Sequence, residues 1–476
     1  MNSLWNDSIE HKTYNELSKD IKTDICIIGS GIFGTTCGYY LSNLGFDTVI
    51  IEKDEIASKT TAFTTGKITS QHGLIYTYLI NSYGKKFATD YLKSNEKAIL
   101  NIKNIIDNEK INCDFEYQNS YVYTTQKSEI PNFMKEVSNL NSLGFNCDFT
   151  TKTGLPFDVA GAICFKNQAQ FNPIKYIYGL CDKILFNKSK IYTHTCAQGI
   201  KKENKKYIIS TNKYKITAKY VIVATHYPFI KLPGFYFTKI YQSTSYTICV
   251  EPKKTLFNEM YINNTEPFFS FRTAKYNGKH VLLICGSDHK TGHETCYKDS
   301  YGALENIAKK YYPNCNILYK WNTEDCISLD KIPYIGIYSK SMPNVFVGTG
   351  FNKWGMTSSN IAANIIVDKI LNKTNEYEYL YNSTRVNPIK NFDELKNIFT
   401  QTTNSFFIDK CKKTNTMLKD IATNSGSIIE INNKKVGIYK DINNNIYAVK
   451  PVCTHLRMLI VLEWYWQNMG LSLPWF

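Results

Sequence analysis

The chain contains no Cys-x-x-Cys pair, although 14 of its 476 residues are cysteines. It also lacks a charged N-terminal segment followed by an apolar one, which a secretory leader would require. Dispersed thiols in a chain without such a leader favour a reduced, cytoplasmic protein with mostly buried cysteines. No uninterrupted apolar run is long enough to cross a bilayer. We therefore predict no transmembrane segment, while peripheral contact with a membrane stays open.

Dense blocks of lysine and arginine are absent as well, although the formal net charge is +15. Such a charge can indicate a nucleic acid or an anionic membrane as partner. The lysines are instead scattered among asparagine, isoleucine and tyrosine, as an AT-rich coding sequence would produce. We therefore expect a generally basic surface and no nucleic-acid partner. The length corresponds to about three globular domains.

The most informative stretch is residues 24–34, where a short apolar run leads directly into Gly-x-Gly-x-x-Gly. A helix-compatible segment follows at 35–44, and a second apolar run at 48–51 ends in Glu52. Strand, tight turn, helix and strand in this order form the context that a dinucleotide-binding fingerprint requires. An ordinary glycine turn in a parallel sheet is the alternative interpretation.

Each glycine of the fingerprint has a distinct expected role. Gly29 permits the turn, Gly31 lets the backbone approach a pyrophosphate, and Gly34 lets the helix pack on the strand. The phosphate charge would lie on free N–H groups at the helix N-terminus. Glu52 is placed to accept hydrogen bonds from a ribose.

Residues 57–74 are rich in threonine, serine and glycine, which makes them too polar for a core. Their small hydroxyl side chains suit a backbone that lies against a ligand, and a solvated loop is the alternative. Further along, helical spacing predicts helices and apolar runs predict strands. The predicted helices are 75–110, 131–143, 301–311 and 358–371, and the predicted strands or strand-rich regions are 115–125, 161–165, 191–223, 241–286 and 344–347.

Pieces of a nucleotide site recur near the start, at Ala224-Thr225-His226 and around Gly350, with strand-rich insertions between them. This interleaving predicts two intertwined domains with the substrate bound between them. Beyond residue 385 a polar linker leads into short strands predicted at 428–431, 435–439 and 446–449.

Taken together, these segments resemble the flavin-dependent oxidoreductases of the D-amino acid oxidase and glycine oxidase superfamily. They are more closely similar to the branch with an appended Rieske iron–sulfur domain. The segments that carry the resemblance are Gly29–Gly34, Thr60–His72, Gln170–Pro173, Ala224–Pro228, Gly350–Thr357 and Cys453–Leu456.

The resemblance implies an α/β and α+β fold. A Rossmann-like FAD-binding domain would be intertwined with an antiparallel-sheet substrate domain, followed by an incomplete small all-β Rieske-like domain. The expected boundaries are 1–22 for a polar lead-in, 23–90, 155–235 and 330–385 for the FAD-binding domain, 91–154 and 236–329 for the substrate domain, 386–404 for a linker, and 405–476 for the Rieske-like domain, aberrant from 457.

The resemblance also implies FAD as the cofactor and assigns residues to it. The ADP contacts would be Gly29, Ser30, Gly31, Gly34 and Glu52. Thr60, Thr61 and Lys67 would lie along the pyrophosphate and isoalloxazine, and Ala224 and Thr225 would form a second strand-end contact. Gly350, Trp354, Gly355 and Met356 would face the pyrimidine side of the ring, where a helix N-terminus stabilises negative charge on the reduced flavin. A plain strand-to-helix turn is the alternative for this last segment.

In this superfamily an amine, often an amino acid, is oxidised at the carbon that bears nitrogen, and the flavin carries the electrons. Arg272 is the candidate clamp for a substrate carboxylate, because its fork matches two oxygens. A structural ion pair is the alternative for Arg272. His72 and His226 are candidates for proton handling or flavin contact, with a hydrogen-bonded structural role as the alternative for each.

A Rieske site takes two cysteines on one iron and two histidines on the other. Cys453 and His455 match the first half of that ligand set, but residues 457–476 contain neither cysteine nor histidine. We therefore expect a [2Fe–2S] cluster in intact relatives and no stable cluster in the chain as written.

Reverse translation offers a reason for the missing half. Read one nucleotide later, permitted codons for Arg457–Trp475 give Gly-Cys-Leu-Leu-Phe-Trp-Asn-Gly-Ile-Gly-Lys-Thr-Trp-Asp-Cys-Pro-Cys-His-Gly, which contains the absent ligands. We hypothesise a single-nucleotide frameshift at the Leu456–Arg457 junction.

These observations predict an FAD-dependent oxidoreductase that oxidises a small amine or amino acid by hydride transfer to flavin. Its intact relatives would pass electrons to a Rieske centre, and a redox partner protein is possible. The alternatives are a different flavin reaction on a larger substrate and a flavin-binding electron-transfer protein without a small substrate of its own.

Overall fold

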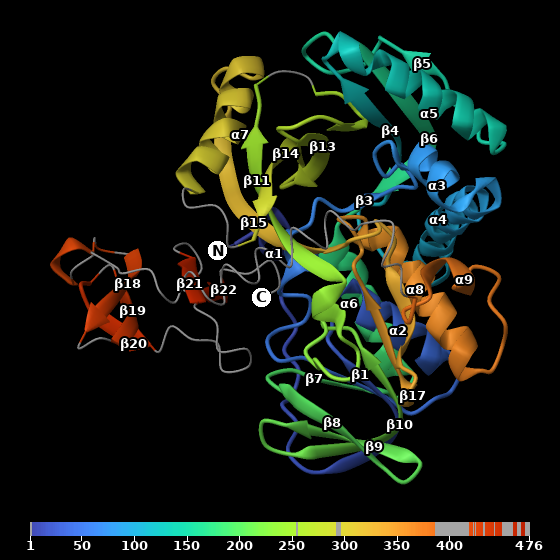
Figure 1. The fold of residues 1–476 in the computed structure, drawn as a ribbon, viewed down its shortest axis with the longest axis vertical. Coiled ribbons are helices and arrows are strands. Elements are labelled where there is room, and N and C mark those ends of the chain that lie inside the picture. The colour runs from blue at the N-terminus through green and yellow to red at the C-terminus, as the bar shows by residue number, and fades with distance from the viewer. Residues whose placement is uncertain are drawn as a thin grey trace.

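The computed structural model describes residues 2–253, 256–291 and 297–385, and beyond them 418–421, 423, 425–431, 434–441, 443–449, 460–463 and 468–471. Two large sheets organise the part up to residue 385 and occupy the lower and upper halves of Figure 1. This arrangement confirms the predicted combination of a parallel α/β unit with an antiparallel unit.

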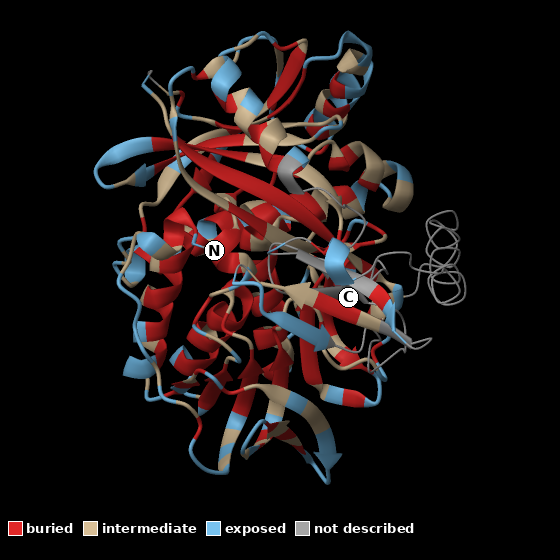
Figure 2. Ribbon diagram, turned by 90° about the vertical axis from the view of Figure 1, so that its left-hand side faces the viewer, coloured by how far each residue is buried: buried red, intermediate tan, exposed pale blue. Residues whose placement is uncertain are grey.

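The first sheet is built around β1 (Ile21–Ile28), which pairs in parallel with its neighbours on both sides. Its path also contains β16 (Tyr334–Ser339), β17 (Met342–Thr349), β10 (Lys215–Val223), β2 (Thr48–Ile51) and β7 (Lys190–Tyr192) in the order β16-β17-β10-β1-β2-β7. The second half of β1 and all of β2 are buried, which explains their continuous apolar sequences. β8 (Ala197–Glu203) and β9 (Lys206–Thr211) form a hairpin on β10, at the bottom of Figure 2, and its outer strand β8 is largely exposed.

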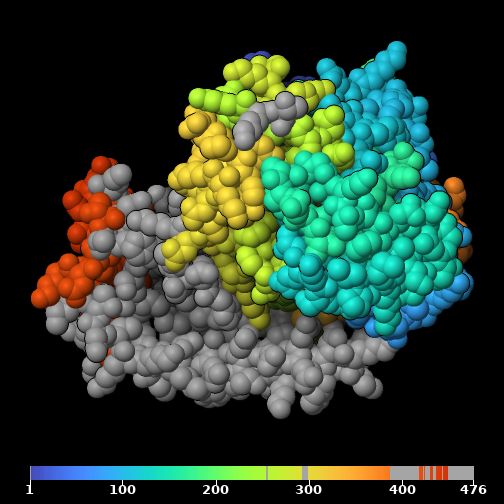
Figure 3. All heavy atoms as spheres, turned by 90° about the horizontal axis from the view of Figure 1, so that it is seen from above, coloured from blue at the N-terminus to red at the C-terminus, as the bar shows by residue number. Residues whose placement is uncertain are grey.

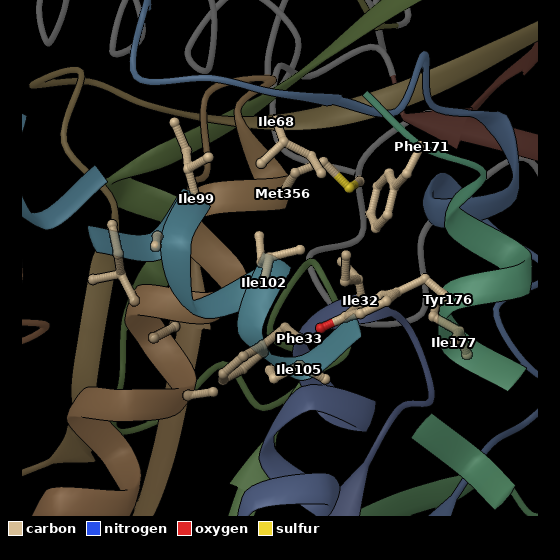
Figure 4. Packing of buried hydrophobic residues seen from close by; sticks show 14 of the residues in the cluster. Ile32, Phe33, Ile68, Ile99, Ile102, Ile105, Phe171, Tyr176, Ile177 and Met356 are labelled. Carbon is tan, nitrogen blue, oxygen red and sulfur yellow. The ribbon is translucent and has the colours of Figure 1, made fainter. Parts of the chain in front are cut away.

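Helices cover the first sheet and link it to the second. α2 (Ile32–Asn43) packs against α6 (Pro173–Phe186) and α8 (Gly355–Ile370), and α8 also packs against α4 (Lys85–Asn108). Figure 4 shows side chains of these four helices meeting in one apolar core. Asn172 starts α6, because its side chain accepts hydrogen bonds from the Ile174 and Lys175 N–H groups and Pro173 follows it.

The second sheet is mostly antiparallel and runs in the order β15-β11-β14-β13-β12-β4-β6-β3. Its strands are β15 (Asn316–Ser328), β11 (Ile240–Glu251), β14 (Lys279–Lys290), β13 (Phe269–Tyr276), β12 (Met260–Asn263), β4 (Glu116–Thr124), β6 (Gly161–Gln170) and β3 (Lys67–Ile68), with β5 (Phe149–Thr150) paired to β6. α7 (Tyr297–Tyr311) covers one face of β11 and β14. α3 (Ile75–Tyr83) packs against α4 and α5 (Ile130–Ser142), and Figure 3 looks down on this end of the molecule.

The hydrogen bonding of β3 and β6 differs from the predicted domain boundaries. Both strands fall within the ranges 23–90 and 155–235 assigned to the FAD-binding domain, yet both belong to the second sheet. The chain therefore crosses between the two sheets as often as the predicted boundaries imply, but it first crosses before β3 and first returns after β6. Which strands pair depends on residues that are far apart in the sequence, so a local sequence pattern does not predict it.

The lead-in at residues 1–22 is more than a polar irregular segment. It contains α1 (Leu4–Asp7), whose Leu4 and Trp5 are buried in the main core. Ser3 donates its hydroxyl to the Ala62 carbonyl, and the Trp5 indole donates to the Thr64 carbonyl at 2.6 Å. These bonds fix the polypeptide around η1 (Thr60–Phe63). The remaining short elements of this part are η2 (Lys127–Glu129), η3 (Tyr236–Thr238) and α9 (Glu378–Tyr381).

The C-terminal part contains a small antiparallel sheet of β18 (Ser425–Ile431), β19 (Lys434–Lys440) and β20 (Ile446–Val449). These strands confirm those predicted at 428–431, 435–439 and 446–449. η5 (Leu418–Asp420) precedes the sheet, and β21 (Ile460–Glu463) pairs with β22 (Asn468–Leu471). Cys453 and His455 lie outside the described residues. Within the described part, no helix combines the length and apolar character that a bilayer crossing requires.

Candidate functional site

A cavity of about 520 Å³ lies where the carboxyl ends of β1 and β10 meet the first turns of α2 and α8. Ligands of open parallel sheets bind in such a crevice at the strand ends. Among the predicted site residues the cavity is lined by Gly29, Gly31, Glu52, Thr60, Thr61, Ala224, Thr225, His226, Gly355 and Met356. The other predicted residues within the described part do not line it, namely Ser30, Gly34, Lys67, His72, Arg272, Gly350 and Trp354.

The glycine turn brings three backbone segments into close approach. Gly29 has φ +108°, and a Cβ there would lie 2.5 Å from the Ala224 carbonyl oxygen at the end of β10. A Cβ on Gly34 would lie 2.0 Å from the Gly29 carbonyl oxygen. α2 begins after Gly31 without a side-chain cap and without an acidic residue in its first turn. Its N-terminal N–H groups are therefore a suitable place for a phosphate.

Glu52 is fixed at the end of β2, where it lines the cavity. One carboxylate oxygen accepts hydrogen bonds from the Ser30 N–H and the Ser30 hydroxyl, each at 2.9 Å. The other oxygen accepts from the Asp54 N–H at 3.2 Å. Ser30 thus orients a carboxylate that can accept hydrogen bonds from a ribose.

The threonine-rich segment is packed against the helix N-terminus instead of forming a solvated loop. The Thr61 hydroxyl oxygen accepts from the Ile32 N–H at 3.2 Å, and the Thr60 hydroxyl donates to the Glu324 carbonyl. Thr61, Ala62 and Phe63 are buried. This segment therefore connects the first turn of α2 to β15 of the second sheet.

His226 lines the cavity from the end of β10. Its backbone has φ +64°, and its carbonyl accepts a hydrogen bond from the Thr349 hydroxyl at 2.6 Å. Burial lowers the pKa of His226 to about 4, so the ring is neutral near pH 7. Nε2 is buried and makes no hydrogen bond of normal geometry with a described residue, although the Glu324 backbone acts on the ring and opposes the effect of burial on its pKa. An unpartnered ring nitrogen in the wall of a cavity is available to a bound cofactor or substrate.

Both ring nitrogens of His72 are occupied by protein partners. Nε2 lies 2.8 Å from the Thr69 carbonyl and Nδ1 lies 2.8 Å from the Tyr91 hydroxyl. A carbonyl only accepts, so Nε2 carries the hydrogen and Nδ1 accepts from Tyr91. The ring stacks on Trp354 with centroids 4.6 Å apart, and burial lowers the pKa of His72 to about 3. His72 is therefore neutral, and its ring supports the ring of Trp354 by stacking.

Arg272 is buried on β13, and its guanidinium donates to backbone carbonyls. Nε donates to Thr273, and Nη1 donates to the Thr65 and Gly66 carbonyls at 2.7 and 3.0 Å and to Phe171 at 3.3 Å. Burial lowers the pKa of Arg272 to about 9, which leaves it charged near pH 7. This geometry binds the threonine-rich segment to the second sheet and does not present a fork to the cavity.

Lys67 on β3 is half-buried near Arg272. Its ammonium donates to the Tyr261 carbonyl at 2.8 Å and to the Ser270 hydroxyl. Burial lowers the pKa of Lys67 to about 7, and the nearby Arg272 charge adds to this effect. Lys67 can therefore exist in both protonation states near neutral pH.

A cluster of charges that the sequence did not indicate lies at the other side of the cavity. Asp325 of β15 and Lys353 line it, and Lys353 forms an ion pair with Asp288 and donates to the Ser245 hydroxyl at 3.0 Å. Lys353 lies within the segment Gly350–Thr357 that the sequence did single out, directly before Trp354. Asp288 and Asp325 come from two strands of the second sheet, and no sequence motif marks them.

The residues present fit an FAD molecule at its nucleotide half. Gly29 and Gly34 leave no room for a Cβ, the N-cap residue Gly31 of α2 has no side chain to cap the helix, and Glu52 lines the cavity beside Ser30. The unpartnered Nε2 of His226 and the first turn of α8 lie on the same cavity. The described residues contain no group of three or more His, Cys, Asp or Glu side chains that could hold a metal ion.

Comparison with known proteins gives matches over most of the chain. The model of the FAD dependent oxidoreductase family DAO matches residues 24–369. A Bacillus subtilis protein, YhfW, whose name describes it as a Rieske 2Fe-2S iron-sulfur protein, is 32% identical over 462 residues. The match covers 97% of this chain and 90% of the relative.

Solved structures share the fold at low sequence identity. L-proline dehydrogenase from P. horikoshii has a TM-score of 0.65 and 19% identity, over 77% of this chain and 98% of its own. Glycine oxidase from Geobacillus kaustophilus also has a TM-score of 0.65, with 15% identity over 77% of this chain and 99% of its own.

Proposed function

Because the chain belongs to the family of FAD-dependent oxidoreductases, we propose that it oxidises a small amine or amino acid at the carbon that bears nitrogen. The observation that carries this proposal is the cavity at the ends of β1 and β10, with the glycine turn at one end and the α8 N-terminus at the other. The structural relatives named as L-proline dehydrogenase and glycine oxidase support a substrate of this class.

The cofactor would be held by residues from both halves of the cavity. Among the residues that line the cavity, Gly29, Gly31 and Glu52 would hold the ADP part, Thr60 and Thr61 the pyrophosphate, Ala224 and Thr225 the second strand end, and Gly355 and Met356 the pyrimidine side. The other predicted cofactor residues would support these contacts from behind the cavity wall, namely Ser30, Gly34, Lys67, Gly350 and Trp354. The chemistry that FAD supplies is acceptance of a hydride from the carbon next to nitrogen, which leaves an imine that water hydrolyses to a carbonyl and an amine or ammonia.

The chain's own residues contribute orientation and electrostatics. The first turn of α8 points N–H groups toward the cavity, where they stabilise negative charge that develops on the ring. Neutral His226 can donate or accept one hydrogen bond through Nε2. A substrate amine that is neutral when hydride leaves needs no dedicated general base.

The route by which electrons leave belongs to the same proposal. In relatives with a complete C-terminal motif, an iron–sulfur centre would receive them one at a time. Cys453 and His455 supply only two of the four ligands in the chain as written. We therefore expect this chain to use an external acceptor, either a redox protein or dioxygen.

The test is anaerobic reduction of the purified flavoprotein, and the bleaching of its visible absorption measures the reduction. The panel contains small amines and both enantiomers of small amino acids. Bleaching by one of these compounds supports the proposal. Bleaching by a reduced protein donor, without bleaching by any amine or amino acid, would instead identify an electron-transfer protein. A folded protein that purifies without flavin and does not take it up would contradict both.

A further inference from the structure

The proposed function leaves the substrate open between amines and amino acids, and the inference below rests on that function. The chain contains three arginines. Arg457 lies outside the described residues, and Arg272 donates its Nε and Nη1 hydrogens to backbone carbonyls. Arg385 forms a bidentate ion pair with Asp330 at 2.7 and 2.8 Å. Neither Arg272 nor Arg385 lines the cavity, so within the described part no arginine is available to hold a substrate carboxylate there.

The lysines of the cavity wall do not replace such an arginine. Lys53 and Lys59 lie at the Glu52 end, where both are within 4.0 Å of Asp54. Lys353 lies at the other end, and its ammonium is paired with Asp288. Burial works to lower the pKa of Lys353, but the charges of Asp288 and Asp325 outweigh it and raise the pKa. Its positive charge is thus already compensated within the protein.

Asp325 is the unbalanced charge of this cluster. It lines the cavity, and none of the described residues donates a hydrogen bond to its carboxylate. The interactions that act on it are the attraction of Lys353 and the repulsion of Asp288. With Asp288 and Lys353 paired, the cluster has one carboxylate in excess. Asp325 is half-buried in the cavity wall, and a carboxylate withdrawn from water without donors is unfavourable unless a ligand supplies them.

The backbone around the cluster has an unusual geometry that places these side chains. Asn352 and Lys353 have φ +53° and +69°, a left-handed conformation that non-glycine residues adopt at a cost. On β14, Ser287 has φ +55° and precedes Asp288, and the pairing of β11 with β14 shifts register at the same level. Such irregularities re-aim side chains next to functional sites. The cluster is therefore held in place by both sheet and loop.

This cluster would repel a substrate carboxylate and attract a substrate ammonium. A carboxylate would face the free carboxylate of Asp325 in a buried place without a compensating arginine, which is costly. An ammonium would supply the missing donors and balance the excess charge. Burial raises the pKa of Asp325 to about 6, so its carboxylate stays ionised in neutral and mildly alkaline solution.

We propose that the substrate is an amine without a carboxylate on its reacting carbon, and that Asp325 binds the substrate's ammonium group. Lys353 and Asp288 are positioning residues, because their ion pair holds β14 and the loop before α8 together. Before the redox step the bound ammonium gives one proton to the Asp325 carboxylate, and the neutral amine then loses a hydride from the carbon next to nitrogen, which the flavin would accept, so that a protonated imine forms.

The first test compares amino acids with their decarboxylated counterparts, using the unmodified flavoprotein under anaerobic conditions. The pairs are lysine and cadaverine, ornithine and putrescine, phenylglycine and benzylamine, and glycine and methylamine, with both enantiomers of each chiral amino acid. We expect at least one amine to reduce the flavin more than about tenfold faster than its parent amino acid, because a charge-assisted contact replaces a repulsion. Reduction by an amino acid as fast as by its amine overturns this inference and leaves the proposed function standing. Reduction by no compound overturns both.

The second test removes the Asp325 charge and measures binding as well as rate. Asp325→Asn is expected to raise the dissociation constant of the reactive amine, measured by calorimetry, by about 10- to 100-fold. The limiting rate of flavin reduction should change less, and Asp325→Glu should recover part of the affinity. Asp182→Asn, which removes an exposed carboxylate of α6 paired with Lys12, is the matched control. Unchanged amine affinity in Asp325→Asn with normal flavin content overturns the assignment. If Asp325→Asn does not retain flavin, the first test, which compares amino acids with their decarboxylated counterparts, decides whether the inference holds.

Discussion

Gly34 is the residue at which the backbone of α2 comes closest to the strand that precedes it. A Cβ at this position would lie 2.0 Å from the Gly29 carbonyl oxygen, and neither backbone can yield without moving α2. We expect Gly34→Ala to destabilise the protein by about 1–3 kcal/mol, as overpacking does. The flavin content of the purified protein should fall with it, as measured by the ratio of visible to protein absorption.

Gly302 offers a matched control for that substitution. It lies in α7, and a Cβ there would meet nothing within 4 Å. Gly302→Ala should leave the flavin content unchanged and stabilise the helix by about 0.5–1 kcal/mol. Normal stability and flavin content in Gly34→Ala would show that α2 does not approach β1 as closely as described.

His72 gives a prediction for the dependence of stability on pH. Burial lowers its pKa in the folded protein to about 3, whereas an unfolded histidine titrates near its reference pKa of about 6.5. Below pH 6.5 the unfolded chain therefore binds a proton that the folded chain does not. The free energy of unfolding should fall by up to about 1.4 kcal/mol per pH unit for this residue as the pH drops from 6.5 toward 3. Urea unfolding at constant ionic strength measures the slope.

His72→Gln keeps a neutral side chain and should reduce that slope, although it costs stability at pH 7 through the lost bonds to Thr69 and Tyr91. His280→Gln, at an exposed position of β14, is the control and should leave the slope as it is. An unchanged slope in His72→Gln would mean that other groups bind the protons in the unfolded state.

At the scale of elements, the sequence correctly predicted helices and strands whose hydrophobic pattern lies within a few consecutive residues. β4 and α5 match the predicted ranges 115–125 and 131–143, because their apolar positions alternate or recur locally. α8 begins at Gly355, three residues before the predicted start at 358, and its first residues Gly355 and Met356 line the cavity. β3 and β6 lie within the ranges predicted for the FAD-binding domain but hydrogen-bond in the second sheet, because strand pairing depends on distant residues.

α1 is an element that the polar composition of the lead-in concealed. Trp5 is 1% exposed, donates to the Thr64 carbonyl and lies 5.2 Å from the Arg272 guanidinium. We expect Trp5→Ala to cost about 3–5 kcal/mol of unfolding free energy, because it leaves a large cavity. Since Trp5 anchors the threonine-rich segment, dissociation of flavin should also become faster, as measured by dilution of the holoprotein.

Phe186 is the matched aromatic control, because it is 78% exposed at the end of α6. Phe186→Ala should change stability by no more than about 0.5 kcal/mol and leave flavin dissociation unchanged. If Trp5→Ala destabilises the protein while flavin dissociates at the normal rate, then α1 supports the core without fixing the cofactor segment.

At the scale of the whole molecule, the candidate site divides into a part that sequence could predict and a part that it could not. The nucleotide end is encoded by one continuous stretch, so the spacing of Gly29, Gly31 and Gly34 predicted it. The charged end is assembled from β14, β15 and the start of α8, and Lys353 and Asp288 are 65 residues apart. These charges are brought together only by the register of the paired strands, and that register could not be predicted from one sequence.

The C-terminal region gives the last prediction. Cys453 and His455 match half of a Rieske ligand set, and a reading frame shifted by one nucleotide after Leu456 would supply Gly-Cys and Cys-Pro-Cys-His. Resequencing should therefore find that the alternative frame encodes these residues. A chain restored to that frame should contain about two irons in addition to flavin, because it has two cysteines and two histidines to bind them.

The restored chain and the chain as written differ only after Leu456, so their visible spectra separate the cofactors. The chain as written should show flavin bands that dithionite bleaches, and the restored chain should add iron–sulfur absorption that Cys453→Ser removes. Addition of a reactive amine without oxygen should then bleach both chromophores in the restored chain, because electrons pass from flavin to the cluster. Iron–sulfur absorption in the chain as written, or an alternative frame without Cys-Pro-Cys-His, would show the frameshift hypothesis to be wrong. If the alternative frame lacks Cys-Pro-Cys-His and the chain as written shows no iron–sulfur absorption, the flavin domain must pass its electrons to an acceptor outside this chain.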